Sequence, residues 1–331
     1  MADELDLLRR ADPVPSDDPR YRDRPLHPQA ERRLDHLLTG GPARVRPRGA
    51  WHGRRWAWGL AASAAVAALA LTLLLSGTTT APAVAAPRPL VVEAGSAAVP
   101  LDRIADSAAA AGDSPRLRQG THVQTWSLAM TGGPGGRPPF TLPEERVVRW
   151  KADGSHTELV VATDPRHPGR PVITDGGDTP RTVQDGHVLS RRSYPPSWSD
   201  APPAARPPHD VRRLRAYLEE IDPVDTMDTP GLLDATAVLL DHWTLGGRES
   251  AVLARLLADA EGLRPLGAVT DRLGREGQAY VYDDTAHSTR RMLILDPATG
   301  AVLGLEDTVT EDEPEYGVHA GDVMSYSAWL R

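Results

Sequence analysis

A window of 32 residues without a formal charge, between Arg55 and Arg88, constrains this chain more than any other feature. Its apolar part runs from Ala57 to Ser76 and contains eight Ala, six Leu, one Val and one Trp. As a helix, these 20 residues span about 30 Å, the hydrocarbon thickness of a bilayer. A buried Ala-rich core helix would normally show a polar face, which this run lacks. We therefore predict one transmembrane helix over residues 56–77.

A cleaved signal peptide is the main alternative for this run. Signal peptides have a short basic start, 7–15 apolar residues and a small-residue cleavage site. Here 55 residues precede the run and the run itself is longer, although Ala83-Val84-Ala85 resembles a cleavage site. A transmembrane helix is therefore the preferred interpretation, and cleavage after it stays open.

Arginines crowd the N-terminal flank of the apolar run, whereas the C-terminal flank carries only Arg88 and then Arg103. The positive-inside rule therefore places residues 1–55 in the cytoplasm and residues 88–331 outside the cell membrane. The net charge of −8 divides into +3 for the inner segment and −11 for the outer one, and this acidic balance argues against direct nucleic-acid binding. The predicted interface anchors, which would contact the lipid bilayer, are Trp51, Arg54, Arg55, Trp56 and Trp58.

Residues 1–55 are too few for a substantial core but contain two short helical patterns. The first stops at Asp12-Pro13 and the second at Gly40-Gly41. We predict two short amphipathic helices in a mostly flexible segment. Their apolar, partner-binding face would consist of Leu5, Leu8, Leu34, Leu37 and Leu38. The alternative is a weakly structured tail that only sets the topology.

The outer segment begins with a Pro- and Ala-rich stretch over residues 78–100, which is typical of a tether. The folded domain is expected over residues 101–331, where strand patterns, helix patterns and again strand patterns follow one another. This order predicts an α+β domain with an antiparallel sheet packed against several helices. The predicted helices are Leu101–Ala111, Asp210–Ile221, Thr229–Trp243 and Glu249–Gly262, and the predicted strands are His122–Met130, Glu145–Lys151, Glu158–Thr163, His187–Tyr194, Leu266–Leu273, Gln278–Tyr282, Arg291–Leu295, Val302–Asp307 and one in the last 20 residues.

No pattern in the sequence predicts a catalytic residue, a cofactor or a metal site. The absence of Cys excludes disulfides, thiol catalysis and Cys-ligated zinc. Gly132–Gly136 lacks the Lys-Ser/Thr of a phosphate-binding loop, and the histidines of the outer segment never pair at helical spacing. Asp283-Asp284 and Glu311–Glu315 lack the pattern of a calcium loop and are interpreted as solvated acidic turns. We therefore expect a protein that is not an enzyme, with a hydrolase as a remote alternative.

Several runs together resemble an actinobacterial family of uncharacterised single-pass membrane proteins. They are Glu4–Pro13, the helix Arg248–Gly262, Gly267–Asp271 with Gly274–Ala279, and Arg291–Gly304. The resemblance spans the whole chain, and members of the family are often encoded next to extracytoplasmic-function sigma factors. It implies an anti-sigma or co-regulatory role, with a sigma factor as the partner of the cytoplasmic segment. No catalytic residues are known for the family, so none is carried over.

Two functions follow from these expectations. The first is a transmembrane regulator or sensor, in which an outer domain responds to an unknown ligand and the inner helices bind a cytoplasmic partner. The second is a membrane-tethered binding module for a lipid, a peptide or cell-wall material, in which the inner segment is only an anchor. A half-open sheet with an apolar concave face would favour the second.

Overall fold

The computed structural model describes residues 87–111, 116–130, 138–175, 180–196, 205–223 and 226–330. The predicted transmembrane helix over residues 56–77, the two inner helices and the five interface anchors lie outside this range. No helix within the described ranges is both long and apolar enough to cross a membrane.

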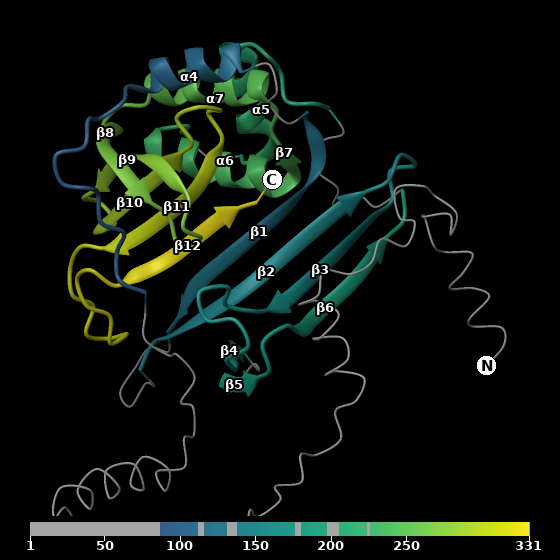
Figure 1. Cartoon of the computed structure of the whole chain (residues 1–331), viewed down its shortest axis with the longest axis vertical. Coiled ribbons are helices and arrows are strands. Elements are labelled where there is room, and N and C mark those ends of the chain that lie inside the picture. Colours follow the sequence, from purple (N-terminus) through teal and green to yellow (C-terminus); the bar gives the residue numbers. More distant parts are fainter. Residues whose placement is uncertain are drawn as a thin grey trace, which may run out of the picture. The chain divides into compact units, whose positions relative to one another are not determined.

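One large antiparallel sheet organises the described domain (Figure 1). Its strand order is β6-β3-β2-β1-β12-β11-β10-β9-β8, and β7 pairs separately with β1. The first and last strands of the domain, β1 and β12, are neighbours and join an N-terminal half to a C-terminal half. The strands are β1 (Arg118–Ala129), β2 (Phe140–Trp150), β3 (His156–Ala162), β6 (His187–Tyr194), β7 (Trp243–Thr244), β8 (Arg264–Thr270), β9 (Glu276–Asp284), β10 (Thr289–Leu295), β11 (Val302–Val309) and β12 (Val323–Trp329), with a separate hairpin of β4 (Val172–Asp175) and β5 (Pro180–Val183).

Four helices are present in the described residues: α4 (Leu101–Ala110), α5 (Val211–Ile221), α6 (Thr229–His242) and α7 (Gly247–Ala258). Two of them begin at aspartates whose carboxylates satisfy free backbone donors of the first turn. Asp210 accepts a hydrogen bond from the N–H of Arg213 at 3.0 Å, and Asp228 accepts one from Gly231 at 3.0 Å. Pro230 in the first turn of α6 adds a residue whose fixed φ suits a helix start.

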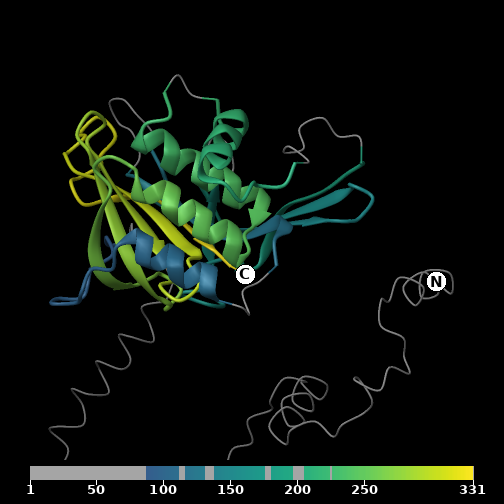
Figure 2. The same ribbon diagram turned by 90° about the horizontal axis from the view of Figure 1, so that it is seen from above.

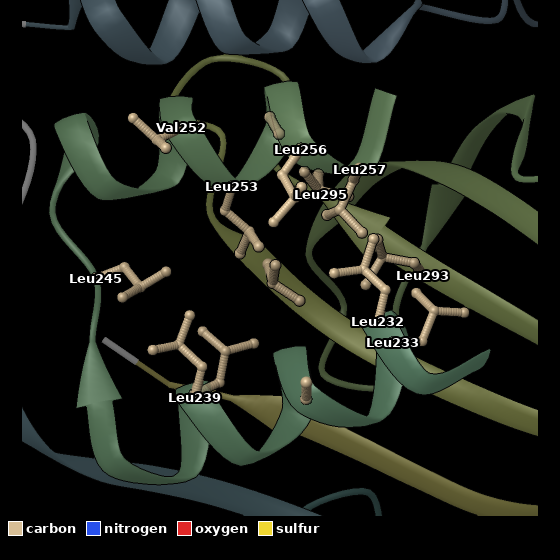
Figure 3. Packing of buried hydrophobic residues seen from close by; sticks show 14 of the residues in the cluster. Leu232, Leu233, Leu239, Leu245, Val252, Leu253, Leu256, Leu257, Leu293 and Leu295 are labelled. Atoms are coloured by element: carbon tan, nitrogen blue, oxygen red, sulfur yellow. The ribbon is translucent and has the colours of Figure 1, made fainter. Parts of the chain in front are cut away.

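The helices lie together on one face of the sheet, as the view from above shows (Figure 2). Their leucines meet those of the sheet in one buried cluster, to which α6 contributes Leu233, α7 contributes Leu257 and β10 contributes Leu293 (Figure 3). These three side chains are at most 1% exposed. Because the chain contains a single Phe, buried Leu and Val side chains supply much of the apolar surface of the core.

The opposite face of the sheet carries a second buried cluster, which includes Trp126, Met292 and Tyr326. Leu90 and Val92, from the chain before the first described helix, pack against this cluster. Buried clusters therefore lie on both faces of the C-terminal half of the sheet.

The predicted fold class is confirmed for the described domain, which is α+β with a large antiparallel sheet and helices on one face. Every predicted helix and strand of the outer segment has a counterpart within a few residues. Three short strands, β4, β5 and β7, were not predicted. They have two to four residues each, too few for a periodic pattern to be visible.

The first described residues already bond to the domain. The N–H of Glu93 donates to the carbonyl of Ala268 at 2.9 Å, and Val92 forms a β-bridge with Val269. The prediction placed these residues in the tether and started the folded domain at residue 101. Residues 92 and 93 therefore belong to the edge of the sheet and are not only a linker.

Candidate functional site

None of the site residues predicted from the sequence can be placed. Leu5, Leu8, Leu34, Leu37 and Leu38 of the partner-binding face lie outside the described residues, as do the interface anchors. Two other regions of the outer domain have the character of functional sites. Sequence reasoning missed both, because each is assembled from residues far apart in the chain.

The first region, here called the tether junction, consists of Arg88, Leu90, Arg272 and Glu306. The Arg272 guanidinium donates both to a Glu306 carboxylate oxygen and, at 2.9 Å, to the carbonyl of Arg88. The second oxygen of Glu306 accepts a hydrogen bond from the N–H of Leu90 at 2.9 Å. One buried ion pair therefore holds the backbone of the residues that directly follow the charge-free window.

The ion pair of the tether junction is almost completely shielded from water. The side chains of Arg272 and Glu306 are 6% and 1% exposed. The Arg272 guanidinium also lies 5.0 Å from the centre of the Tyr326 ring, a cation–π distance. Burial raises the pKa of Glu306, and the positive charge of Arg272 counteracts part of that rise. Each partner is therefore stable in this environment only because the other is present.

The second region lies on the strands β2, β3 and β6, here called the arm (Figure 1). On the face opposite to the helices, the arm has a hollow of about 380 Å³. We name it the arm hollow, and Glu158 also contributes to its lining. The side chains that face it are Val147, Arg149, Thr157, Leu159, Arg191 and Ser193.

Strand register arranges these side chains in two rows. Arg149, Thr157 and Ser193 lie opposite one another across the three strands. Val147, Leu159 and Arg191 form the next row on the same face. Directly opposed residues of antiparallel strands have Cβ atoms about 5 Å apart, so each row is a contiguous surface.

The other face of the arm carries a stack of three rings. Trp150 and His156 have ring centres 4.1 Å apart and nearly parallel planes, and His156 and Tyr194 have ring centres 4.4 Å apart. The stack crosses β2, β3 and β6 and fixes their register at the far end of the arm. Burial lowers the pKa of His156, and the charge of Glu158 counteracts this in part.

This stack predicts a pH dependence of arm stability. The folded arm favours neutral His156. The stability that neutral His156 contributes to the folded protein is therefore present above the unfolded pKa of about 6.5 and is lost as the pH falls below it. Replacing His156→Phe keeps the stack but removes the titration. Between pH 7.5 and pH 5.5 we expect the thermal midpoint to fall about 2 °C further in the wild type than in the variant. The exposed His187→Phe on β6 is the control; an equal acid shift in all three proteins would contradict the prediction.

The runs that carry the family resemblance have structural roles in the described domain. Asp271 is fully buried, and its carboxylate accepts hydrogen bonds from the N–H of Leu273 and from the Arg275 guanidinium at 2.7 Å. Arg275 also donates to the carbonyls of Leu303 and Trp329. A Cβ at Gly277 would lie 2.6 Å from the Ile294 side chain, so the close packing there requires glycine.

The acidic residues of the β9–β10 turn are not simply solvated, contrary to the prediction. Asp284 is 6% exposed and accepts hydrogen bonds from the N–H groups of Ala286 and His287. Burial opposes ionisation of Asp284, but its bonds to His287 outweigh burial and lower its pKa. Asp283 pairs with Arg264 and Arg290. Among the described residues, no group of three His, Asp or Glu side chains could hold a metal ion.

Comparisons with known proteins do not extend this description. No protein-family model matches the sequence, and no curated protein matches it. Among solved structures, the chain has a weak similarity to the dehydratase domain from the CurK module of Curacin polyketide synthase, with 8% identity and a TM-score of 0.11. That match covers 71% of this chain and 82% of the other. A TM-score this low carries no argument about fold or activity.

Proposed function

We propose that this chain is a single-pass protein of the cell membrane that acts as a transmembrane regulator or sensor without enzymatic activity. In this proposal the described domain is extracytoplasmic. Residues 1–55 are cytoplasmic and bind a partner in the manner of an anti-sigma factor, through Leu5, Leu8, Leu34, Leu37 and Leu38. The partner expected from the resemblance is a sigma factor.

The tether junction is the observation that supports coupling between the two sides. A domain with no coupling to the membrane segment would need only a linker that is not bonded to the domain. Instead, Arg272 and Glu306 hold the backbone at Arg88 and Leu90 from two different parts of the sheet. A ligand that shifts β11 or the β8–β9 turn would therefore act directly on the chain that enters the membrane.

The arm hollow favours a second candidate function. A membrane-tethered binding module for a lipid, a peptide or cell-wall material needs a surface for its ligand, and no signalling role. The hollow supplies an open surface with unpaired polar groups, whether or not the inner segment has a partner. The two candidates differ only in what residues 1–55 do.

The absence of Cys makes a direct test of topology and partner possible. A single cysteine introduced by Ala81→Cys should react with a membrane-impermeant maleimide in intact cells, and one introduced by Ser16→Cys should react only after lysis. In the same cells, full-length protein should capture a sigma factor that is encoded next to it. Leu34→Asp should reduce this capture about tenfold. Arg9→Gln is the matched control.

The outcomes separate the two candidate functions. Reversed labelling would overturn the orientation and with it both proposals. Correct labelling with no sigma-factor capture, or with capture unchanged in Leu34→Asp, would overturn the regulator. The binding module would be favoured if an unrelated basic anchor replaced residues 1–55 without a phenotype.

A further inference from the structure

We propose that the arm hollow binds the headgroup of an anionic lipid, with the lipid phosphate between Arg149 and Arg191 and its first apolar atoms over Val147 and Leu159. This inference rests on the proposed function only in placing the domain outside the membrane.

The charge pattern of the domain supports an anionic ligand. Residues 88–331 carry a net charge of −11, and most buried or half-buried arginines have carboxylate partners. Examples are Arg166 with Asp164, and Arg291 with Asp234 and Asp307. Within the described residues, the exposed side chains of Arg149 and Arg191 have no hydrogen bond or ion pair, and they share one face of three adjacent strands. Two unpaired guanidiniums on one face of an acidic domain form a local site for an anion.

The neighbouring side chains fit a phosphate group. The hydroxyls of Thr157 and Ser193 occupy the row of Arg149 and are one row from Arg191. Guanidinium groups bind phosphate oxygens through paired N–H donors, and hydroxyl groups complete the shell. Two carboxylates lie near the arginines, and both have other partners. Glu158, in the lining, accepts a hydrogen bond from the Tyr194 hydroxyl at 3.2 Å and pairs with Arg146 at 3.5 Å. Glu145, in the next row, is bonded to His122 at 2.5 Å. Neither carboxylate is paired with Arg149 or Arg191.

Beside the Arg149 row, the backbones of β1 and β2 approach each other closely at a glycine. Gly120 of β1 pairs with Arg149, and its φ of 112° is one that side chains rarely adopt. A Cβ at this position would overlap the carbonyl of Val148. The close approach of the two backbones and the positive φ therefore require glycine at this position.

The apolar part of the ligand follows from the second row. Val147 and Leu159 are half-buried and form one row with Arg191. Leu159 lies beside Arg191, and Val147 lies two residues before Arg149 on β2. A free phosphate would leave these side chains in water, whereas the glycerol and acyl carbons of a lipid would cover them. The volume of about 380 Å³ is within the range of small-molecule sites and is suited to a headgroup with its first carbons.

The length of the tether makes membrane lipid the expected source. Ten residues, 78–87, separate the predicted helix from the first residue of the tether junction. Fully extended, they reach at most about 36 Å. In the proposed topology the domain is therefore held close to the outer leaflet.

The test uses full-length protein in phosphatidylcholine nanodiscs and isothermal titration calorimetry. The probe is dihexanoyl phosphatidylglycerol below its micelle concentration; dihexanoyl phosphatidylcholine, inorganic phosphate and an acidic hexapeptide are the competing ligands. We expect saturable binding of phosphatidylglycerol, at least tenfold tighter than of the other three. Arg149→Gln with Arg191→Gln should weaken it at least tenfold. Leu159→Ser should weaken binding of the lipid and leave binding of inorganic phosphate unchanged.

Arg192→Gln is the matched control, because Arg192 neighbours Arg191 in sequence but lies on the other face of β6. Equal loss in this variant would overturn the site. Binding of phosphatidylcholine as tight as that of phosphatidylglycerol would overturn the role of charge. Equally tight binding of inorganic phosphate would overturn the assignment of a lipid as the ligand. Preferential binding of the peptide would assign the hollow to a protein ligand. None of these results depends on the cytoplasmic partner, so failure here is distinct from failure of the proposed regulator.

Discussion

Arg272→Met is expected to destabilise the outer domain by about 3–5 kcal/mol, because it leaves the carboxylate of Glu306 buried without its partner. Glu306 is 1% exposed and burial already raises its pKa, so loss of Arg272 removes the one positive charge that favours the ionised form. The measurement is pulse proteolysis of the full-length protein across a urea series. Arg255→Met is the control, because its pair with Asp106 is exposed and should contribute less than about 1 kcal/mol.

A double variant separates the stability of the pair from its attachment of the tether. Arg272→Met with Glu306→Leu replaces the pair by apolar side chains and should recover most of the lost stability. The N–H of Leu90 and the carbonyl of Arg88 would still lack their partners, so residues 88–92 should exchange amide hydrogens faster than in the wild type. Unchanged exchange in the double variant would show that the tether junction does not hold this segment.

Arg275→Met should cost about 3 kcal/mol or more in the free energy of unfolding. The variant removes the guanidinium that pairs with buried Asp271 and that also donates to the carbonyls of Leu303 and Trp329. Leaving a charge and two carbonyls without these donors combines two unfavourable terms. The same urea series measures the change.

Arg264→Met is the matched control for Arg275→Met. Arg264 lies at the start of β8, is 51% exposed and pairs with Asp283 at the surface, so its removal should cost less than about 1 kcal/mol. Similar unfolding midpoints for the two variants would contradict the structural role assigned to Arg275. A large effect confined to Arg275 would explain why a Gly-Arg-x-Gly turn occurs in the runs that carry the family resemblance.

The helices and hairpins of the outer domain could be predicted because their signals are local. Asp210 precedes the helix that it caps, and Asp153-Gly154 lies between the two strands that it joins. The three strands that were not predicted have four or fewer residues each. They depend on pairing partners, such as β1 for β7, that no local pattern reveals.

The two candidate sites could not be predicted, because their residues meet only through sheet register. Arg272 lies in the β8–β9 turn and Glu306 lies on β11, and Leu90 is 216 residues from Glu306. The arm hollow combines residues of β2, β3 and β6, and each of them alone resembles an exposed strand residue. Alternation along one strand shows which residues share a face, but not which strand lies beside it.

The sequence by itself determined the division of this chain into a basic segment, a charge-free window and an acidic segment, since charge and hydropathy depend only on the order of residues. It also determined the α+β class of the outer domain through caps, turns and periodicity. The tertiary structure alone decided that β1 lies beside β12, that the tether is bonded to the sheet and that two unpaired arginines share one face. These features depend on long-range pairing, whose free energy comes from contacts between segments that carry no mutual signal in the sequence.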